Sequence, residues 1–186
     1  MISTVNFTDH FLIAMPALAD PNFFHSVTYL CEHSERGAMG IVINRPTELT
    51  LQTILNHMEI SSTLPNEQIS VYSGGPIQPD RGFILHPTGR MWESTLRVGK
   101  SISVTTSRDI LEAMAGGDGP RQCLVALGYA GWGPGQLEQE IAENAWLTGP
   151  SDPDILFRTP SADRWQAAAR SFGIDIALVS GVAGHA

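Results

Sequence analysis

The sequence predicts a single α+β domain over residues 1–186, in which a mostly antiparallel or mixed β-sheet carries about four short helices. Strand-like runs follow one another without helices between residues 69 and 106, whereas a parallel α/β fold would alternate the two. The helical patterns are few and irregularly placed. The 186 residues, 42% of them hydrophobic, suffice for one core and contain no linker, charge block or internal repeat.

The N-terminal part predicts a brief turn and a β-hairpin. Asp20 followed by Pro21 is typical of the N-cap and first position of one helical turn. The runs SVTYLCEH (26–33) and AMGIVINR (38–45) predict two strands. Gly37, between them, can take the positive φ of a short connection, so we expect the two strands to form a hairpin.

The middle of the chain predicts an amphipathic helix and a set of strands. Leu51, Ile54, Leu55 and Met58 recur at i, i+3, i+4 and i+7, which gives LQTILNHM (51–58) one apolar helical face. The strands expected after it are ISVY (69–72), GFILH (82–86), ESTLRV (93–98) and SISVTT (101–106).

The C-terminal part predicts helices around one central strand. Ser107 can cap a helix that Gly116 ends. The run QCLVALGYAG (122–131) is apolar almost throughout, as expected of a central strand covered on both faces. The remaining expected elements are a helix over 136–144, a helix over 159–172 and a closing strand, IDIALVS, over 174–180.

The charge distribution argues against nucleic acid as a partner. The net charge is −8, and affinity for DNA comes chiefly from Lys and Arg side chains that neutralise phosphates. Residues 81–108 hold five basic residues and one acid, a local net of +4, whereas residues 109–154 hold eight acids and one Arg, a local net of −7. Neither run is continuous, so we interpret them as neutralising each other on one surface. We do not expect direct DNA binding.

Neither a membrane span nor an export signal is predicted. The longest apolar stretch, residues 11–19, is interrupted by Pro16 and is far shorter than the roughly 20 residues of a membrane helix. The N-terminus lacks the basic segment of a secretory signal. Cys31 and Cys123 lie in apolar strand-like runs, so we expect buried free thiols. These features predict a cytoplasmic protein without membrane association.

Three segments have unusual loop compositions. They are GAMGIVINRP (37–46), SGGP running on to DRGFILH (73–86), and GYAGWGPGQLEQEI (128–141). Together with FLIAMPALADPNFFHSVTYLCEH (11–33) and the closing GHA (184–186), they resemble the signature of the YqgE/AlgH family of small bacterial proteins over essentially the whole chain. The resemblance implies one α+β domain with a coiled sheet and a biochemical activity generally regarded as unknown. One branch of that family carries a transcriptional-regulator label linked to exopolysaccharide control.

The common catalytic and cofactor signatures are missing from the sequence. It contains no GxxxxGK[ST], HExxH or GxSxG, and no GxGxxG that opens a helix. GWGPG precedes a helix, but Glu138 and Glu140 already satisfy the positive end of that helix. We therefore expect no cofactor and no metal. The favoured interpretation is a non-enzymatic regulatory or binding module that acts through a protein or small-molecule partner and affects transcription only indirectly.

We predict the binding site where the three segments meet, because loops dense in Gly and Pro on rigid strands commonly carry sites. Trp132, between two glycines, must pack under another loop or offer a face to a ligand. Gln136, Glu140 and Asn144 should align on one side of a helix, and this stripe either receives a ligand or clamps the hairpin. The candidate residues are Asn44, Arg45, Gly74, Gly75, Asp80, Arg81, His86, Trp132, Gln136, Glu138, Glu140 and Asn144.

An enzymatic alternative rests on histidines and carboxylates. The six histidines are scattered singly, and none pairs with another at metal-ligand spacing. His33, His86 and Glu138 could assemble a zinc site, or either histidine could act as a general base oriented by Glu138 or Glu140. This alternative is a hydrolase-like or metal-assisted enzyme.

Overall fold

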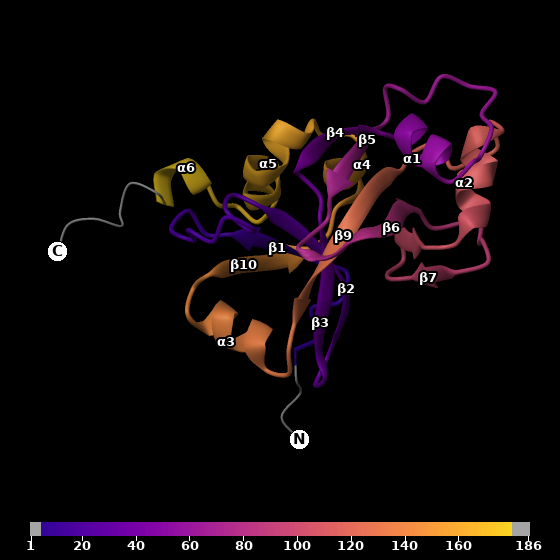
Figure 1. Ribbon diagram of the computed structural model, residues 1–186. Coiled ribbons are helices and arrows are strands. Elements are labelled where there is room, and N and C mark those ends of the chain that lie inside the picture. The colour runs from indigo at the N-terminus through magenta and orange to yellow at the C-terminus, as the bar shows by residue number, and fades with distance from the viewer. Residues whose placement is uncertain (1–4, 180–186) are drawn as a thin grey trace.

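The computed structural model describes residues 5–179 and contains one curled ten-stranded sheet (Figure 1). Most of the strands follow the order β10-β1-β2-β3-β9-β6-β8-β7, and β4 and β5 form a branch that joins β9. The strands are β1 (His10–Ala14), β2 (Val27–Ser34), β3 (Gly37–Val42), β4 (Pro46–Thr50), β5 (Ser70–Ser73), β6 (Ile77–Pro87), β7 (Thr95–Arg97), β8 (Ile102–Thr105), β9 (Leu124–Trp132) and β10 (Trp146–Pro150).

β9 joins the two halves of the sheet. Its C-terminal part pairs antiparallel with β3 from Ala38 to Gly40, and its N-terminal part lies between β5 and β6. β5 and β9 run parallel, whereas the other described pairs are antiparallel. Leu124 and Ala126 of β9 are buried in one apolar cluster and Val125 in another, so both faces of the strand are covered there, which explains its nearly continuous apolar sequence.

The helices are short, and two of them begin at a polar residue whose side chain caps them, whereas the predicted cap Ser107 makes no side-chain cap hydrogen bond to the helix at 108–115. Thr50 caps α1 through its side chain, and Asp152 caps α4 in the same way. None of the helices within residues 5–179 is long and apolar enough to cross a membrane. The helices are α1 (Leu51–His57), α2 (Arg108–Ala115), α3 (Gln136–Ala142), α4 (Pro153–Phe157), α5 (Arg164–Ser171) and α6 (Ile176–Val179), with a 3-10 turn at Ser161–Asp163.

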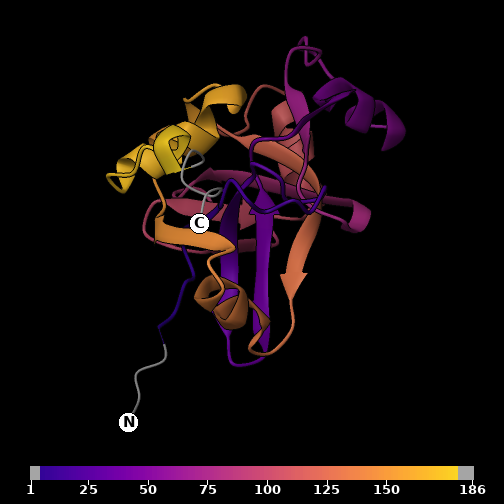
Figure 2. The same cartoon turned by 90° about the vertical axis from the view of Figure 1, so that its left-hand side faces the viewer.

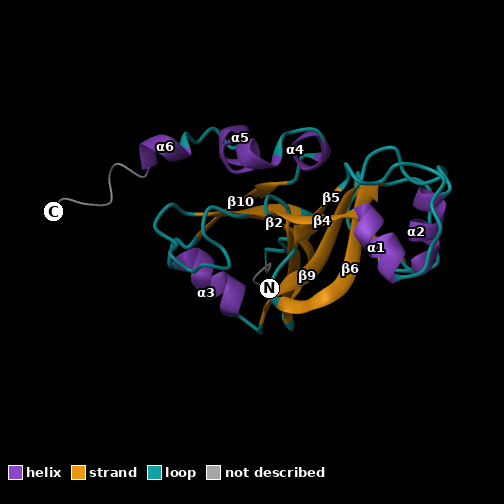
Figure 3. Ribbon diagram, turned by 45° about the horizontal axis from the view of Figure 1, so that its top comes forward, coloured by secondary structure: helices purple, strands orange, loops and turns teal. Residues whose placement is uncertain are grey.

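The helices cover different parts of the curled sheet. α4, α5 and α6 lie together over one face, α1 and α2 lie at the far end, and α3 lies beside β10 (Figures 1 and 3). Figure 2 shows the yellow C-terminal helices well separated from the purple α1. The buried apolar residues form three clusters that follow this division: one under α4–α6, one under α1 and α2, and one under α3.

The predicted α+β class is confirmed, as are the hairpin at β2–β3, the helix at α1 and the central strand at β9. The predicted strand over 174–180 is wrong in its described part, because residues 176–179 form α6. Asp175 accepts a hydrogen bond from the Ala177 amide and starts this turn. Ile176 is 2% exposed while Leu178 is 72% exposed, whereas a strand would place both on one face. Ser180 and the GHA tripeptide lie outside the described residues.

Several boundaries and elements differ from expectation. The predicted helix over 159–172 begins later, with the 3-10 turn followed by α5 from Arg164. Residues 21–25 form hydrogen-bonded turns in which the Phe24 amide donates to the Asp20 carbonyl. Four elements were not predicted from the sequence, namely β1, β4, β10 and α4. Of these, β4 is mostly exposed and carries no apolar alternation.

Candidate functional site

The three segments predicted to form the site meet through their backbones on β9. The Val42 amide donates to the Gly74 carbonyl at 2.8 Å, and the Gly74 amide donates to the Leu127 carbonyl at 2.8 Å. Gly75 has a φ of 151°, and a Cβ on it would lie 2.1 Å from the carbonyl carbon of Tyr129. Only glycine permits this approach, so these glycines serve a close crossing of two backbone segments.

Asn44 and Arg45 hold the turn that precedes the hairpin. The Asn44 side-chain oxygen accepts from the Val27 amide at 2.9 Å, and its nitrogen donates to the His25 carbonyl at 2.9 Å. The Arg45 guanidinium donates to three backbone carbonyls within residues 21–24. All hydrogen-bond partners described for these two side chains therefore lie between residues 21 and 27, and none of them is on α3.

The polar stripe predicted on α3 is divided among separate roles. The Gln136 side-chain oxygen accepts from the Gly133 amide at 3.0 Å and fixes the turn into the helix. Asn144 has a φ of 60° and follows the end of the helix in the left-handed conformation. Glu140, half-buried, points toward two indoles. Gln136 and Glu140 thus lie on α3 and Asn144 just beyond it, and the three residues have different roles.

Trp132 packs under neighbouring aromatic rings and is 5% exposed. Its ring stacks on Phe23 with centroids 6.0 Å apart and meets Trp146 edge-on at 6.0 Å. Burial raises the pKa of Glu140, against the opposing effect of the Trp132 and Trp146 indoles. Within residues 5–179, Glu140 Oε2 and Trp146 Nε1 lack partners at hydrogen-bond geometry.

His33 and Glu138 form a close pair. His33 Nε2 lies 2.5 Å from Glu138 Oε1, and His33 Nδ1 accepts the Phe7 amide proton at 2.9 Å. Because Nδ1 is an acceptor, we place the ring proton on Nε2, where it is donated to Glu138. Both ring nitrogens are therefore engaged in ties between β2, α3 and the N-terminal segment.

His86 lies in another part of the molecule and is 1% exposed. Its Nε2 lies 2.7 Å from Thr105 Oγ1 and its Nδ1 lies 3.0 Å from the Pro87 carbonyl. Burial lowers the pKa of His86, and the Pro87 carbonyl partly opposes that shift. His86 and His33 line different cavities, of about 590 Å³ and 600 Å³. The structure thus does not assemble the histidines of the enzymatic alternative into one site.

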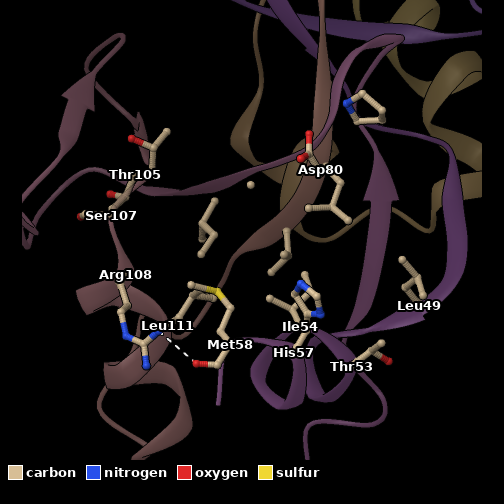
Figure 4. A pocket seen from close by; sticks show the side chains of 16 residues that line it. Leu49, Thr53, Ile54, His57, Met58, Asp80, Thr105, Ser107, Arg108 and Leu111 are labelled. Carbon is tan, nitrogen blue, oxygen red and sulfur yellow. Dashed lines mark hydrogen bonds between the residues drawn. The ribbon is translucent and has the colours of Figure 1, made fainter. Parts of the chain in front are cut away.

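Among the cavities that residues 5–179 form, the one with the most apolar lining is a groove between α1 and α2, over β6 and β9 (Figure 4). Its volume is about 600 Å³, within the range of pockets that hold small organic ligands. Its walls are mainly aliphatic, and the side chains that form them include Leu49, Ile54, Met58, Ile84, Leu111, Val125 and Leu127.

The amphipathic sequence of α1 produces one wall of the groove. Leu51 and Leu55 are fully buried under the helix, whereas Ile54 and Met58 are half-buried and line the groove. From the opposite side, α2 contributes Leu111, which is 8% exposed. The apolar face of α1 is thus wider than the part that packs on the sheet, and the apolar residues left uncovered line the groove.

The alternation of β6 decides which of its residues reach the groove. Asp80, Gly82 and Ile84 line it. Arg81 and Phe83 belong to the other face of the strand, where the Arg81 guanidinium lies 5.2 Å from the Phe83 ring centroid. Asp80 and Arg81 were predicted together, but they serve opposite faces of the sheet.

Gly82 forms part of the groove floor and leaves it open. It pairs with Leu127 of β9, and these cross-strand neighbours face the same side. A Cβ on Gly82 would have Cδ2 of Leu127, at 4.0 Å, as its nearest described neighbour. A larger side chain at position 82 would therefore extend into the groove without a backbone clash.

The rim of the groove carries a few polar groups. Arg108 connects α2 to α1, because its Nη1 donates to the Met58 carbonyl at 3.0 Å (Figure 4). Its Nε donates to Glu112 at 2.8 Å. Asp80 is exposed and has no hydrogen-bond or ion-pair partner among residues 5–179. His57 lies in the last turn of α1. The free carboxylate of Asp80 is thus the rim acceptor that a ligand could engage.

Of the predicted site residues, only Asp80 lines this groove. Ile54 and Met58 were not predicted as lining residues, because their helical spacing is that of ordinary core residues. The exposed Leu49, with 42% of its surface accessible, follows no pattern in the sequence. A cavity depends on which apolar residues are left uncovered, and spacing along the chain does not specify that.

Comparison with known proteins shows similarity over the whole chain. A family model described as AlgH-like (DUF179) matches residues 11–177. A UPF0301 protein of Thioalkalivibrio sulfidiphilus is 64% identical over all 186 residues of both chains. A UPF0301 protein of Nitrosococcus oceani is 55% identical over 182 residues, with 97% of each chain covered.

Solved structures show the same fold. The solution structure of the AlgH protein from Pseudomonas aeruginosa superposes with a TM-score of 0.80 at 50% identity, covering 100% of this chain and 99% of that one. The crystal structure of protein DIP2367 from Corynebacterium diphtheriae has a TM-score of 0.77 at 21% identity, covering 97% and 94% of the two chains. The fold is thus shared even with a protein of 21% sequence identity.

Proposed function

The chain belongs to the AlgH-like family (DUF179), whose biochemical function is unknown, and we propose that it is a non-enzymatic module that binds a small, largely apolar ligand between α1 and α2. The observation that carries this proposal is the open aliphatic groove of about 600 Å³. Apolar surface left in water is unfavourable by about 25 cal/mol per Å², so such a groove is better explained by an occupant.

The rim indicates which polar group the ligand carries. Arg108 already donates to Glu112 and Met58, whereas the Asp80 carboxylate has no described partner. A ligand with an apolar body and one hydrogen-bond donor at its end would fill the groove and reach Asp80. The body supplies most of the affinity, because a hydrogen bond to an exposed carboxylate competes with water.

We extend the proposal to regulation and to cellular location. An effect on transcription would pass through the ligand or through a protein that recognises the occupied groove, since the net charge of −8 opposes contact with DNA phosphates. The unpaired thiols of Cys31 and Cys123 support a cytoplasmic setting.

The test fills the groove from its floor. Nile red, a neutral apolar dye, is titrated into the protein while its fluorescence is recorded. The Gly82→Leu variant, whose new side chain enters the groove, is expected to weaken dye binding about tenfold or more. The matched control is Gly89→Leu, because position 89 is equally open, has no positive φ and lies outside the groove.

Equal dye binding by the wild type and both variants would contradict the proposal. An unfolding curve for each variant shows whether the fold is intact, and NMR shifts for Leu111 and Leu127 report where the dye binds. Dye-induced shifts confined to residues outside α1, α2, β6 and β9 would also reject the groove as the site.

A further inference from the structure

A second cavity, separate from the groove, lies beyond the end of β6. Its volume is about 590 Å³, and segments far apart in the sequence build it: the loop after β6, the connection between α2 and β9, and the residue that follows α4. Each of these segments contributes one arginine to the lining, namely Arg90, Arg121 and Arg158. This gathering of cations is distinctive in a chain of net charge −8 that has only 11 basic residues.

Most N–H donors of the three guanidinium groups have no described hydrogen-bond partner within residues 5–179. Nη1 of Arg90 donates to the backbone and side-chain oxygens of Asp118, both at 2.9 Å. Nε of Arg158 lies 3.6 Å from Asp154 Oδ1, beyond hydrogen-bond distance, and Arg121 has no described partner within residues 5–179. Three cations against the two acids Asp118 and Asp154 leave a net of +1, with most N–H donors unused.

Arg90 is held in place and gives the cavity a fixed cationic edge. Its guanidinium carbon lies 5.0 Å from the centroid of the Trp92 ring, which is itself 8% exposed. The bonds from Nη1 to Asp118 hold the same guanidinium. A group fixed in this way loses little conformational entropy when it binds a ligand, which favours affinity.

The floor of the cavity is neutral and rigid. His86 lines it, and both of its ring nitrogens already lie within hydrogen-bond distance of Thr105 and the Pro87 carbonyl. Thr105 in turn lies 2.7 Å from Thr95, whose hydroxyl accepts from the Trp92 amide. The positive charge of the cavity therefore comes from its arginines, and the hydrogen-bonded chain keeps the floor in position.

We propose that this cavity binds the phosphate group of a small phosphorylated molecule. Guanidinium groups match the geometry of phosphate oxygens through paired N–H donors, and a dianion can engage several of them at once. The cavity is larger than inorganic phosphate alone requires, so an organic moiety is expected beside the proline and tryptophan side chains of the lining. The inference rests on this cavity and stands independently of the groove.

The experiment titrates inorganic phosphate and then phenyl phosphate into the intact protein, with sodium chloride at matched ionic strength as the reference. Amide shifts of Gly89 and Gly119, both in the lining, report binding by NMR. Saturable binding of inorganic phosphate with a Kd below about 10 mM is expected. Phenyl phosphate is expected to bind at least about threefold more tightly, because its ring fills part of the remaining volume.

Variants test which residues carry the site. Arg121→Gln and Arg158→Gln should each weaken phosphate binding about tenfold, as expected for the loss of hydrogen bonds to a charged group. Both side chains are free of tight described contacts, so the variants should fold. Arg170→Gln is the matched control, because Arg170 is an exposed arginine of α5 outside the cavity.

Each possible result decides the proposal. Shifts no larger than those in sodium chloride, or equal affinity in the wild type and both cavity variants, would overturn it. Phenyl phosphate binding no more tightly than inorganic phosphate would overturn the assignment to an organic phosphate. Loss of binding in Arg170→Gln to the same extent would show that the effect comes from net charge rather than from this cavity.

Discussion

The two ends of β9 carry different kinds of surface. Near its C-terminal end, Gln136 is paired with the Gly133 amide and His33 with Glu138, while Oε2 of the half-buried Glu140 has no described partner. Near its N-terminal end, Val125 borders the open aliphatic groove. The polar residues that are conspicuous in the sequence thus mostly build structure, whereas the open surface is made of residues that resemble ordinary core.

The two ends of β9 should also differ in how substitutions change the stability of the fold. A satisfied hydrogen bond contributes only about 1 kcal/mol net, but leaving one of its buried partners unpaired costs about 1–3 kcal/mol. Substitutions at the α3 end that leave a buried hydrogen-bond partner unpaired should therefore lower the stability of the fold without changing ligand binding. The groove end should tolerate substitutions that fill it, because they remove apolar surface from water, and should lose ligand instead.

The largest expected effect is that of Gly75→Ala. Its φ of 151° and the 2.1 Å approach to the Tyr129 backbone leave no room for a methyl group. We expect the free energy of unfolding, measured with urea, to fall by about 3 kcal/mol or more. In contrast, Gly82→Leu should change it by less than about 1 kcal/mol, because the new side chain enters the groove.

A smaller effect is expected from Arg45→Ala. Its guanidinium donates to three backbone carbonyls in the turn of residues 21–24, and these carbonyls would lose their partners. The free energy of unfolding should fall by about 1–3 kcal/mol while Nile red binding in the groove stays unchanged. Arg121→Ala, at an exposed position, is the matched control. Loss of dye binding without loss of stability would place Arg45 in a ligand site after all.

Most of the fold could be predicted because its strongest elements have local signals. The spacing of Leu51, Ile54, Leu55 and Met58 predicted α1, and the apolar run 122–131 predicted β9 as a central strand. The strand expected over 174–180 failed because its apolar run fits a short buried helix equally well, and Asp175 decides between them by starting a turn.

The candidate site was much less predictable. Glycines such as Gly75 marked where backbones cross, and the sequence does not show whether a crossing leaves a cavity. Arg90, Arg121 and Arg158 are more than 30 residues apart in sequence, and only the fold brings them to one cavity. Of the predicted site residues, only Asp80 lines the groove. The alternation of β6 places Asp80 on the groove side of the strand and Arg81 on the opposite side.

The smallest expected effects separate two carboxylates on α3. The pKa of Glu138 is lowered by a hydrogen bond from its own amide and by His33. Glu138 therefore stabilises the folded state at pH values above its ordinary pKa of 4.5, and this contribution is lost as the pH falls. Burial raises the pKa of Glu140, so its stabilising contribution exists at low pH and disappears as the pH rises above 4.5. At neutral pH, Glu138→Gln should lower the free energy of unfolding by a few tenths of a kcal/mol, and Glu140→Gln should raise it by less than about 1 kcal/mol, since both groups are partly screened by solvent. Urea unfolding across the acid and neutral range measures both slopes, and two slopes of the same sign would contradict the different environments assigned to these neighbours.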